Sequence, residues 1–528
     1  MKFSIQANLS FLVLLCVINL QSPWTQTTTH LLLISLVSLL PFVLRYWLVP
    51  GGFAWRNYYD PTKLHGPSGW PVLGTLPEMG SLAHRKLANT AVRMGATRLM
   101  AFSLGTVPVV ISSHPDTAKQ ILSGPAFSDR PVKISARVLM FERAIGFAPS
   151  GGTYWRHLRR IAALHMFSPR KLSELEPLRQ RIADEMIVGI EARRGGAVVL
   201  REVLQKGSLD NVLESVFGNV EGVLEPREEL GSMVKEGFEL IEKFNMEDYF
   251  PAVKFLDFFG VKRRCFKLTE KVNIVLGRII RERRKIAVGP ESTIKENHRD
   301  FLSALLSLPE HEQLRESDMV PILWEMVFRG TDTVAILLEW IMARMVLHPE
   351  IQAKAQQELD AKVGRGRQVQ DSDILNLPYL QAIVKEVLRL HPPGPLLSWA
   401  RLAIHDVHVD KTFIPAGTTA MVNMWAITHD PTLWADPWEF KPERFIELDV
   451  SIMGSDLRLA PFGSGRRVCP GKALGLTTVQ LWLARFLHQF EWLPTDQSVN
   501  LSERLKLSME MKRPLICYVA ERANLPTP

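Results

Sequence analysis

The stretch that decides the fold reads Phe462-Gly463-Ser464-Gly465-Arg466-Arg467-Val468-Cys469-Pro470-Gly471. It places one cysteine in a glycine-rich loop, shortly after two arginines and before a long apolar helical pattern. Glycine has no Cβ, so the loop backbone can turn tightly and approach a flat group closely. The charges of Arg466, Arg467 and the following helix N-terminus favour a thiolate at Cys469. The stretch predicts an activated thiolate beside a flat cofactor, with a buried structural thiol as the alternative.

The same ten residues resemble the haem-binding loop of the cytochromes P-450, which has the pattern Phe-x-x-Gly-x-Arg-x-Cys-x-Gly. All the fixed positions of that pattern match, namely Phe462, Gly465, Arg467, Cys469 and Gly471. The resemblance implies that Cys469 is the axial thiolate ligand of haem b iron and that the other four residues shape the haem site. A cysteine ligand donates electron density to the iron and favours cleavage of the O–O bond.

Composition excludes several other classes of protein. The chain has 528 residues and four cysteines, which are far apart and show neither a CxxC pair nor metal-ligand spacing. A disulfide framework is therefore not expected, and a reducing compartment is implied. No CxxCH sequence occurs, so covalent c-type haem attachment is excluded. The net charge is +8, but no basic, aromatic-interleaved array is present, and we expect no nucleic-acid partner.

Two apolar segments stand near the N-terminus. Leu9–Leu20 is short, whereas Leu31–Val49 has about the length that spans a bilayer. A cleaved signal peptide is the competing interpretation, but no small-residue cleavage site is followed by a polar mature start. Arg56 and Lys63 follow the second segment, so the positive-inside rule keeps the bulk of the chain cytosolic. We expect residues 1–59 to be an anchor in the endoplasmic reticulum membrane, with one span or two.

Residues 60–528 form the predicted catalytic domain. Residues 60–75 begin it with alternating Pro and Gly that end any helix, and they resemble the proline-rich hinge of microsomal cytochromes P-450. A short hairpin is expected over Arg98–Ser112 and a long irregular segment over Phe127–Ser150. The resemblance implies the cytochrome P-450 fold, which is mainly α with a smaller β region.

The longest uninterrupted helical pattern runs over Ser317–His348. Its middle is Arg329-Gly330-Thr331-Asp332-Thr333, where glycine and threonines are poor interior helix formers. Such violations of local propensity tend to mark functional sites or kinks, although core packing is the alternative. The segment resembles the family's (Ala/Gly)-Gly-x-(Asp/Glu)-Thr, which implies that Asp332 and Thr333 relay protons during oxygen activation. Relatives that rearrange peroxides need no such relay, so the pair favours a monooxygenase.

Arg329 departs from that pattern, because the family normally has a small residue at this position, facing the distal haem pocket. We therefore hypothesise that Arg329 binds a carboxylate or another acidic head group of the substrate. Two alternatives remain: Arg329 pairs with Asp332 three residues later, or it turns outward.

A scaffold for the cysteine loop is predicted further along. The helical pattern Leu377–Leu390 contains Glu386 and Arg389, which are three residues apart and share a face. Pro442-Glu443-Arg444-Phe445 lies in a proline-rich segment. Together they resemble the family's Glu-x-x-Arg helix and its Pro-Glu-Arg-Phe segment, which implies that Glu386, Arg389 and Arg444 form a buried triad that locks the cysteine loop. A surface Glu–Arg pair, worth little, is the alternative.

The haem propionates need cations, and the resemblance supplies candidates. Gly151-Gly152 opens a helix in which Trp155 and Arg159 lie four residues apart on one face. In the family a Trp-x-x-x-Arg helix holds a propionate, and a surface Trp–Arg pair is the alternative reading. Arg401 and Arg467 are the further propionate ligands that the resemblance implies.

Two neighbouring segments complete the expected site. His391 to Arg401 is expected to leave the preceding helix as an extended strand, with Leu396 and Leu397 as an apolar wall of the substrate pocket. A long amphipathic helix is expected over Ala473–Phe490, with its N-terminal amides directed at the thiolate.

The resemblance covers residues 60–520, and it is strongest to plant A-type cytochromes P-450 of family 78, subfamily A. It implies a microsomal haem-thiolate monooxygenase that inserts one oxygen atom from O2 into a C–H bond of a small lipophilic, fatty-acid-like substrate. Electrons would come from NADPH through a membrane-bound reductase, and a role in plant organ growth is implied. The alternatives are an isomerase or dehydratase on the same fold, and a non-enzymatic haem carrier or sensor.

Overall fold

The structure is a computed structural model that describes residues 34–35, 37–39, 47–58, 64–218, 227–253, 256–288, 300–397 and 400–522. The predicted segment Leu9–Leu20 lies outside the described residues, as does most of Leu31–Val49. Within the described ranges, no helix has both the length and the apolar character needed to cross a bilayer.

Helices make up most of the described chain, as expected. The longer ones are α3 (Ala83–Arg93), α4 (Pro115–Ser123), α6 (Thr153–His165), α8 (Glu176–Glu191), α9 (Leu200–Phe217), α10 (Arg227–Glu242), α11 (Val261–Val288), α13 (Glu316–Gly330), α14 (Asp332–Leu347), α15 (Pro349–Lys362), α16 (Pro378–Leu390) and α19 (Lys472–Gln489). The short ones are α5 (Ile134–Leu139), α7 (Pro169–Glu174), α12 (Phe301–Leu306), α17 (Met424–Thr428) and α18 (Arg444–Glu447). The bounds of α16 and α19 agree with the predicted helices to within about one residue.

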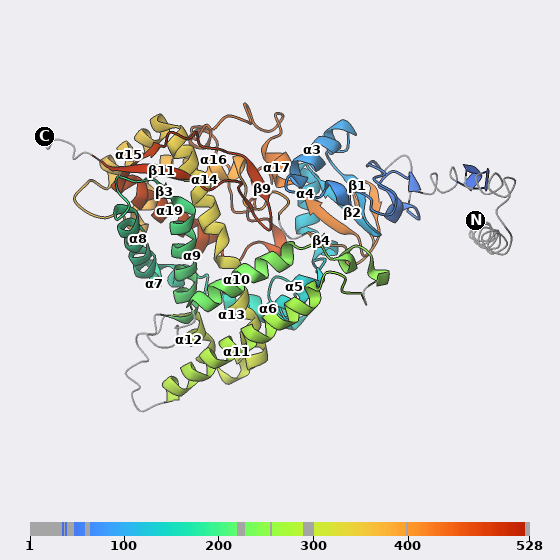
Figure 1. Ribbon diagram of the computed structural model, residues 1–528, viewed down its shortest axis with the longest axis horizontal. Helices are drawn as coiled ribbons and strands as arrows, with labels where there is room; N and C mark the ends of the chain where they lie inside the picture. Colours follow the sequence, from blue (N-terminus) through green and yellow to red (C-terminus); the bar gives the residue numbers. More distant parts are fainter. Residues whose placement is uncertain are drawn as a thin grey trace, which may run out of the picture.

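The β region is smaller and lies mostly at the other end of the molecule from α8 and α15 (Figure 1). Its strands are β1 (Met100–Leu104), β2 (Val107–Ser112), β3 (Val198–Val199), β4 (Arg401–Leu402), β5 (Val407–Val409), β6 (Thr412–Ile414), β7 (Thr419–Val422), β8 (Phe490–Pro494), β9 (Glu503–Leu505), β10 (Met509–Met511) and β11 (Ile516–Glu521). The main sheet has the order β1-β2-β7-β4, and β3-β11-β8 form a second sheet near α8 and α15.

The predicted hairpin over Arg98–Ser112 is confirmed. β1 and β2 pair antiparallel with Met100 opposite Ile111, and Gly105 makes the turn at φ 59°. β7 then joins β2 in parallel, and β4 closes the sheet antiparallel to β7. The last pairing brings Arg401, in β4, beside the loops that precede α5 and α6.

The core is built from large side chains of the central helices. Trp324 in α13, Trp340 in α14 and Trp482 in α19 are completely buried. α14 is nearly all apolar and packs against α9, α16 and α19. A helix that is apolar on every side must be enclosed by other elements, so α14 forms the centre around which the helical part is arranged.

The expected single helix over Ser317–His348 is wrong in one respect, because α13 and α14 are separate helices that meet at Thr331. Thr331 keeps helical angles (φ −75°, ψ −47°), so the axis continues while the hydrogen bonding changes. The Thr331 hydroxyl donates to the carbonyl of Val327 at 2.7 Å, and the Ser208 hydroxyl donates to the carbonyl of Thr331 at 2.5 Å. Side chains that bond to helix carbonyls in this way compete with the backbone hydrogen bonds of the helix.

Two other expectations differ from the structure. The segment Phe127–Ser150 is not wholly irregular, because it contains the short helix α5. The segment from His391 to Arg401 is not an extended strand, because Pro395 and Leu396 form a turn and Leu397 has φ 47°. Only Arg401 and Leu402 pair as a strand. Alternation of apolar residues beside prolines did not distinguish a turn from a strand here.

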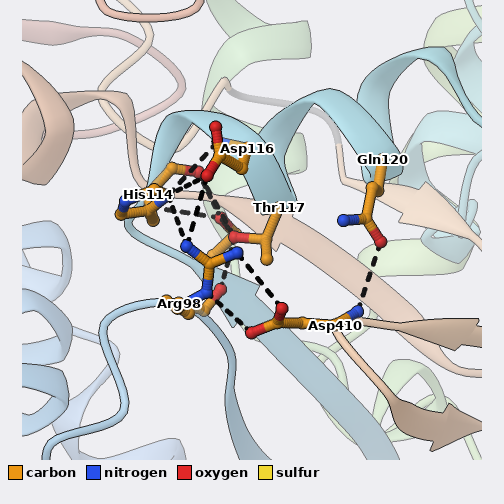
Figure 2. A network of polar contacts seen from close by, with 7 residues as sticks. Arg98, His114, Asp116, Thr117, Gln120 and Asp410 are labelled. Atoms are coloured by element: carbon orange, nitrogen blue, oxygen red, sulfur yellow. Dashed lines mark hydrogen bonds and ion pairs between the residues drawn. The ribbon is translucent and has the colours of Figure 1, made fainter.

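An exposed polar network fastens the sheet end of the molecule (Figure 2). The Arg98 guanidinium donates to both oxygens of Asp410, at 2.7 and 3.1 Å, and to Asp116 at 3.3 Å. The Gln120 side chain accepts from the Asp410 amide at 3.2 Å. The network joins α4 to the turn between β5 and β6, and it is a surface connection, since Arg98 is 44 % exposed.

Candidate active site

The loop around Cys469 is closed by its own backbone. Cys469 donates its amide to the carbonyl of Phe462 at 3.0 Å, and Gly463 and Gly465 have φ 73° and 69°. A Cβ at Gly465 would collide with the carbonyl of Leu122 in α4. Glycine is therefore required at Gly465 both for its left-handed conformation and for the close approach of α4.

The Cys469 side chain stands in a different electrostatic setting from the other described cysteines. Burial raises the pKa of the Cys469 thiol, while Arg329, the Gly471 amide, Arg159 and Arg130 lower it. Burial raises the pKa of Cys265 and of Cys517 to about 12. Several cations thus face Cys469, as a thiolate ligand requires.

The predicted propionate residues converge on this loop from distant parts of the chain. Arg159, in α6, donates to the carbonyl of Val468 at 2.6 Å. Arg401, in β4, donates to the carbonyl of Ser464 at 3.1 Å. Trp155 donates its indole N–H to the carbonyl of Ile145 at 2.9 Å, and the Arg467 guanidinium lies 4.8 Å from the centre of its ring.

Arg467 connects the cysteine loop to the segment before α6. Its guanidinium donates to the carbonyls of Ser128, Ile145 and Ala148, at 3.0, 2.9 and 2.6 Å. It also donates to the Asp129 carboxylate at 3.3 Å. These bonds tie three separate turns of the loop between α4 and α6 to the residue two positions before Cys469.

Arg130 belongs to the same group, and sequence reasoning missed it. Burial lowers the pKa of Arg130 well below its usual range, and Arg401, Arg329 and Arg467 lower it further. The only sequence signal is its position before Pro131 in the long segment expected to bind a ligand. The charges that act on it, such as Arg401 and Arg467, are hundreds of residues away in sequence.

This group of buried cations tests whether a haem would fit. Burial and the nearby Arg467 lower the pKa of Arg401 to about 10, and the Arg401 Nε has no hydrogen-bond partner in the described part of the chain. The carboxylates that act on Arg130 and Arg467 are Asp129 and Glu325. More buried cations than anions therefore surround a thiol that is itself faced by positive charge. A flat, iron-bearing group with two carboxylates matches this arrangement.

The predicted scaffold triad is assembled. Arg389 donates to both oxygens of Glu386, at 2.8 and 2.9 Å, and Arg444 donates to Glu386 at 3.1 Å. The three side chains are 0 %, 0 % and 6 % exposed, so the alternative of a surface pair is wrong. Arg389 also donates to the carbonyls of Thr428 and Pro437, at 2.9 and 2.7 Å.

Asp332 and Thr333 lie at the start of α14. Thr333 is exposed, and burial together with Glu510 raises the pKa of Asp332 to about 6. The other charges that act on Asp332 are Lys506 and Arg201. Of the charged residues in α13 and α14, Arg329 is the one that acts on the pKa of Cys469.

Arg329 extends from α13 toward the loop before α6. Its guanidinium lies 3.3 Å from Glu325, one helical turn earlier, and is 33 % exposed. Glu325 is buried and also accepts from the Gly146 amide at 2.8 Å. Arg329 is therefore paired with Glu325, and this pair links Arg329 to the loop that carries Ile145 and Ala148.

A cavity of about 750 Å³ lies between α10, the main sheet and the β9–β10 hairpin. Leu396 lines it, as predicted for the apolar wall, together with Pro395 and Ala400. Leu397 does not line it, and instead packs against the buried cluster that includes Trp55. The left-handed turn at Leu397 is the reason that the two leucines separate.

Comparison with known proteins gives the same picture over nearly the whole chain. The family model described as "Cytochrome P450" matches residues 64–518. The chain is 50% identical to Cytochrome P450 78A3 of Glycine max, over 96% of this chain and 98% of that protein. It is 52% identical to Cytochrome P450 78A5 of Arabidopsis thaliana, over 92% and 95%. A solved zebra fish cytochrome P450 with progesterone has a TM-score of 0.70 at 25% identity, covering 83% of this chain and 99% of that one.

Proposed function

The chain belongs to the cytochrome P450 family, and we propose that Cys469 is the haem ligand with which it oxidises a small lipophilic substrate. Members of this family are monooxygenases that bind haem through a cysteine thiolate and receive electrons from NAD(P)H. The observation that carries the assignment to Cys469 is the excess of buried arginines around its loop. When bound, the haem supplies the activation of O2 for insertion of one oxygen atom into a C–H bond.

The residues of the chain hold and orient the cofactor. Arg159, Arg401 and Arg467, with Arg130, would bind the haem carboxylates, because burial lowers the pKa of all four guanidiniums and they gather around the Cys469 loop. The Gly471 amide donates to the Cys469 sulfur and moderates its donation to the iron. Glu386 and its two arginines hold the loop geometry and take no part in the chemistry.

Asp332 and Thr333 would move protons on the opposite face. A carboxyl group with a pKa of about 6 can take up and release a proton near neutral pH, which general acid–base transfer requires. The Thr333 hydroxyl is exposed and follows it directly, so it can pass a proton onward through water. This pair supports oxygen insertion rather than isomerisation or dehydration.

The proposed substrate is apolar and carries an acidic group, like a fatty acid. Leu396 supplies part of an apolar cavity, and Arg329 supplies a partly exposed cation whose field reaches Cys469. Arg329→Ala should weaken turnover of long-chain acids more than turnover of their methyl esters. Equal loss for both would show that Arg329 does not contact the acidic group.

We also propose anchoring in the endoplasmic reticulum membrane and a redox partner that docks on the thiolate side, where Arg466 is exposed. The partner would be the NADPH-dependent reductase. The biological setting that we propose is plant organ growth; the similar proteins of Glycine max and Arabidopsis thaliana are themselves plant proteins.

The decisive experiment is the carbon-monoxide spectrum of the reduced protein, followed by NADPH consumption with the reductase. We expect the thiolate-type spectrum and substrate-dependent consumption. Cys469→His should lose both even where haem is retained. A thiolate spectrum without O2 turnover would favour an isomerase, a dehydratase or a haem carrier instead.

A further inference from the structure

Several charged residues line the cavity of about 750 Å³, and the proposed chemistry does not use them. We call these residues the rim: Lys133, Arg137, Glu242, Glu247, Asp248, Arg504 and Lys506. Neither Cys469 nor Arg329 lines the cavity, so it is distinct from the cation group beside the thiol. Its apolar wall includes Leu104, Val109, Ile241, Leu396, Met421 and Leu507. Apolar walls suit an aliphatic chain, and a few convergent charges would then select the group at its end.

Three cations stand on the rim. Lys133 and Arg137 lie one helical turn apart at the start of α5, where the Arg137 amide donates to the carbonyl of Lys133 at 2.9 Å. Arg504, in β9, lines the same cavity. In the described part of the chain, neither Lys133 nor Arg504 has a carboxylate within 4.0 Å, and Arg137 reaches only Glu142, at 3.9 Å. A fourth rim cation, Lys506, is already paired with Glu510 at 2.7 Å.

The carboxylates of the rim compete weakly for these cations. Burial raises the pKa of Glu242 and of Asp248, while Arg504 lowers that of Glu242 and Lys133 that of Asp248. Asp248 is further occupied because it accepts from the Ile134 amide at 2.8 Å. Glu247 lies 3.8 Å from Lys262, a residue outside the cavity. The rim therefore carries an excess of positive charge above an apolar wall.

We propose that Lys133, Arg137 and Arg504 form an anion site at the mouth of the cavity, which captures the carboxylate of an amphipathic aliphatic acid. The aliphatic chain of the ligand lies along the apolar wall, and the neutral ester of the same acid is not selected. The site rests on the proposed function, since it assigns a substrate class to the same enzyme. It acts in capture, whereas Arg329 lies beside the reacting centre.

Binding can be measured on the full-length, haem-loaded protein without turnover. Displacement of fluorescent cis-parinaric acid would give the affinities of hexadecanoic acid and of methyl hexadecanoate. The test variant is Lys133→Gln combined with Arg504→Gln. Lys512→Gln is the matched control, because Lys512 is an exposed lysine near the same hairpin that does not line the cavity.

We expect the double variant to lose about tenfold in affinity for the acid, the size of one charge-assisted hydrogen bond, and less than about twofold for the ester. The control should bind both like the wild type. KM for the acid should rise while kcat stays unchanged, because the rim does not touch the reacting centre.

Three results would overturn the site. The first is equal weakening for acid and ester, and the second is unchanged binding of the acid in the double variant. The third is displacement of the probe by phosphatidylglycerol vesicles as effective as displacement by the acid, which would assign the cations to a membrane lipid. A wild-type protein with a thiolate spectrum that binds neither acid nor ester would instead overturn the proposed substrate class itself.

Discussion

Two groups of buried arginines differ in their counter-charges. One is the scaffold triad with Glu386, and the other surrounds the Cys469 loop. In the triad, Arg389 and Arg444 share Glu386, and their remaining N–H groups reach backbone carbonyls. Around the loop, Arg401 keeps an Nε without a hydrogen-bond partner in the described chain, and its pKa is lowered by burial and by Arg467. Both arginines of the first group bond one shared buried carboxylate, whereas the charge that acts on Arg401 in the second group is another cation, Arg467.

The difference separates a structural charge cluster from a binding site. Removing one member of a buried, balanced pair leaves an uncompensated charge, which is strongly destabilising. Buried cations with few carboxylates nearby are costly, and strongly perturbed groups of this kind gather at binding sites. Substitutions in the triad should therefore lower fold stability, and substitutions around the loop should weaken cofactor binding instead. Four measurements test this difference.

The largest effect is expected for Glu386→Ala. The change leaves Arg389 and Arg444 buried without their carboxylate, and should lower the free energy of unfolding by about 3 to 5 kcal/mol. Urea unfolding, followed by loss of the thiolate-type spectrum, would measure it. Glu439→Gln is the control: this exposed carboxylate contributes only its backbone carbonyl to Arg389, so the variant should stay within about 0.5 kcal/mol of wild type. A loss of unfolding free energy below about 1 kcal/mol in Glu386→Ala would mean that the triad contributes no more than a surface ion pair.

Arg401→Met should act on cofactor binding more than on the fold. Haem release to apomyoglobin should accelerate about tenfold, since one charge-assisted contact is lost. The haem-free protein should be as stable as the wild type or more stable, because a buried, poorly balanced cation is removed. Arg389→Met, the matched change in the triad, should destabilise both forms. Equal destabilisation by the two variants would erase the distinction between the groups.

Asp332→Asn tests a carboxyl group at the start of α14 whose pKa is raised mainly by burial. Because the folded-state pKa of Asp332 is raised to about 6, its protonated form favours folding at low pH, and this contribution is lost as the pH rises through that value. Wild type should therefore lose about 1 kcal/mol relative to Asp332→Asn between about pH 5 and about pH 7.5. Urea midpoints of the two proteins at both pH values would measure this. A constant difference would mean that Asp332 is ionised throughout.

The smallest effect is expected for Arg98→Gln, in the network of Figure 2. Arg98 contacts two carboxylates, whereas Arg389 and Arg444 each contact one, yet Arg98 is 44 % exposed. Water screens such pairs, so the loss of unfolding free energy should be below about 1 kcal/mol. Thermal unfolding would measure it. A loss as large as that of Glu386→Ala would show that burial does not govern the contrast.

Much of the site was predictable because its signals are local. The cysteine loop, the Glu386–Arg389 spacing and the Trp155–Arg159 spacing are short patterns, and each predicted the element on which the structure places it. Turns were less predictable. The Pro395–Leu397 turn was expected as a strand, because proline and apolar residues occur in both, and the left-handed Leu397 carries no sequence signal.

The motifs around Cys469 and around Asp332 and Thr333 are contiguous, so the sequence alone predicted haem-thiolate monooxygenase chemistry. Which distant side chains meet depends on the tertiary structure. It brought Arg130 to Arg401 and Arg467, paired Arg329 with Glu325, and placed Arg504 and Lys133 in the lining of one cavity. The physical reason is that burial and charge balance depend on neighbours in space, which for these residues come from the packing of α5, α13 and the sheets rather than from adjacent sequence.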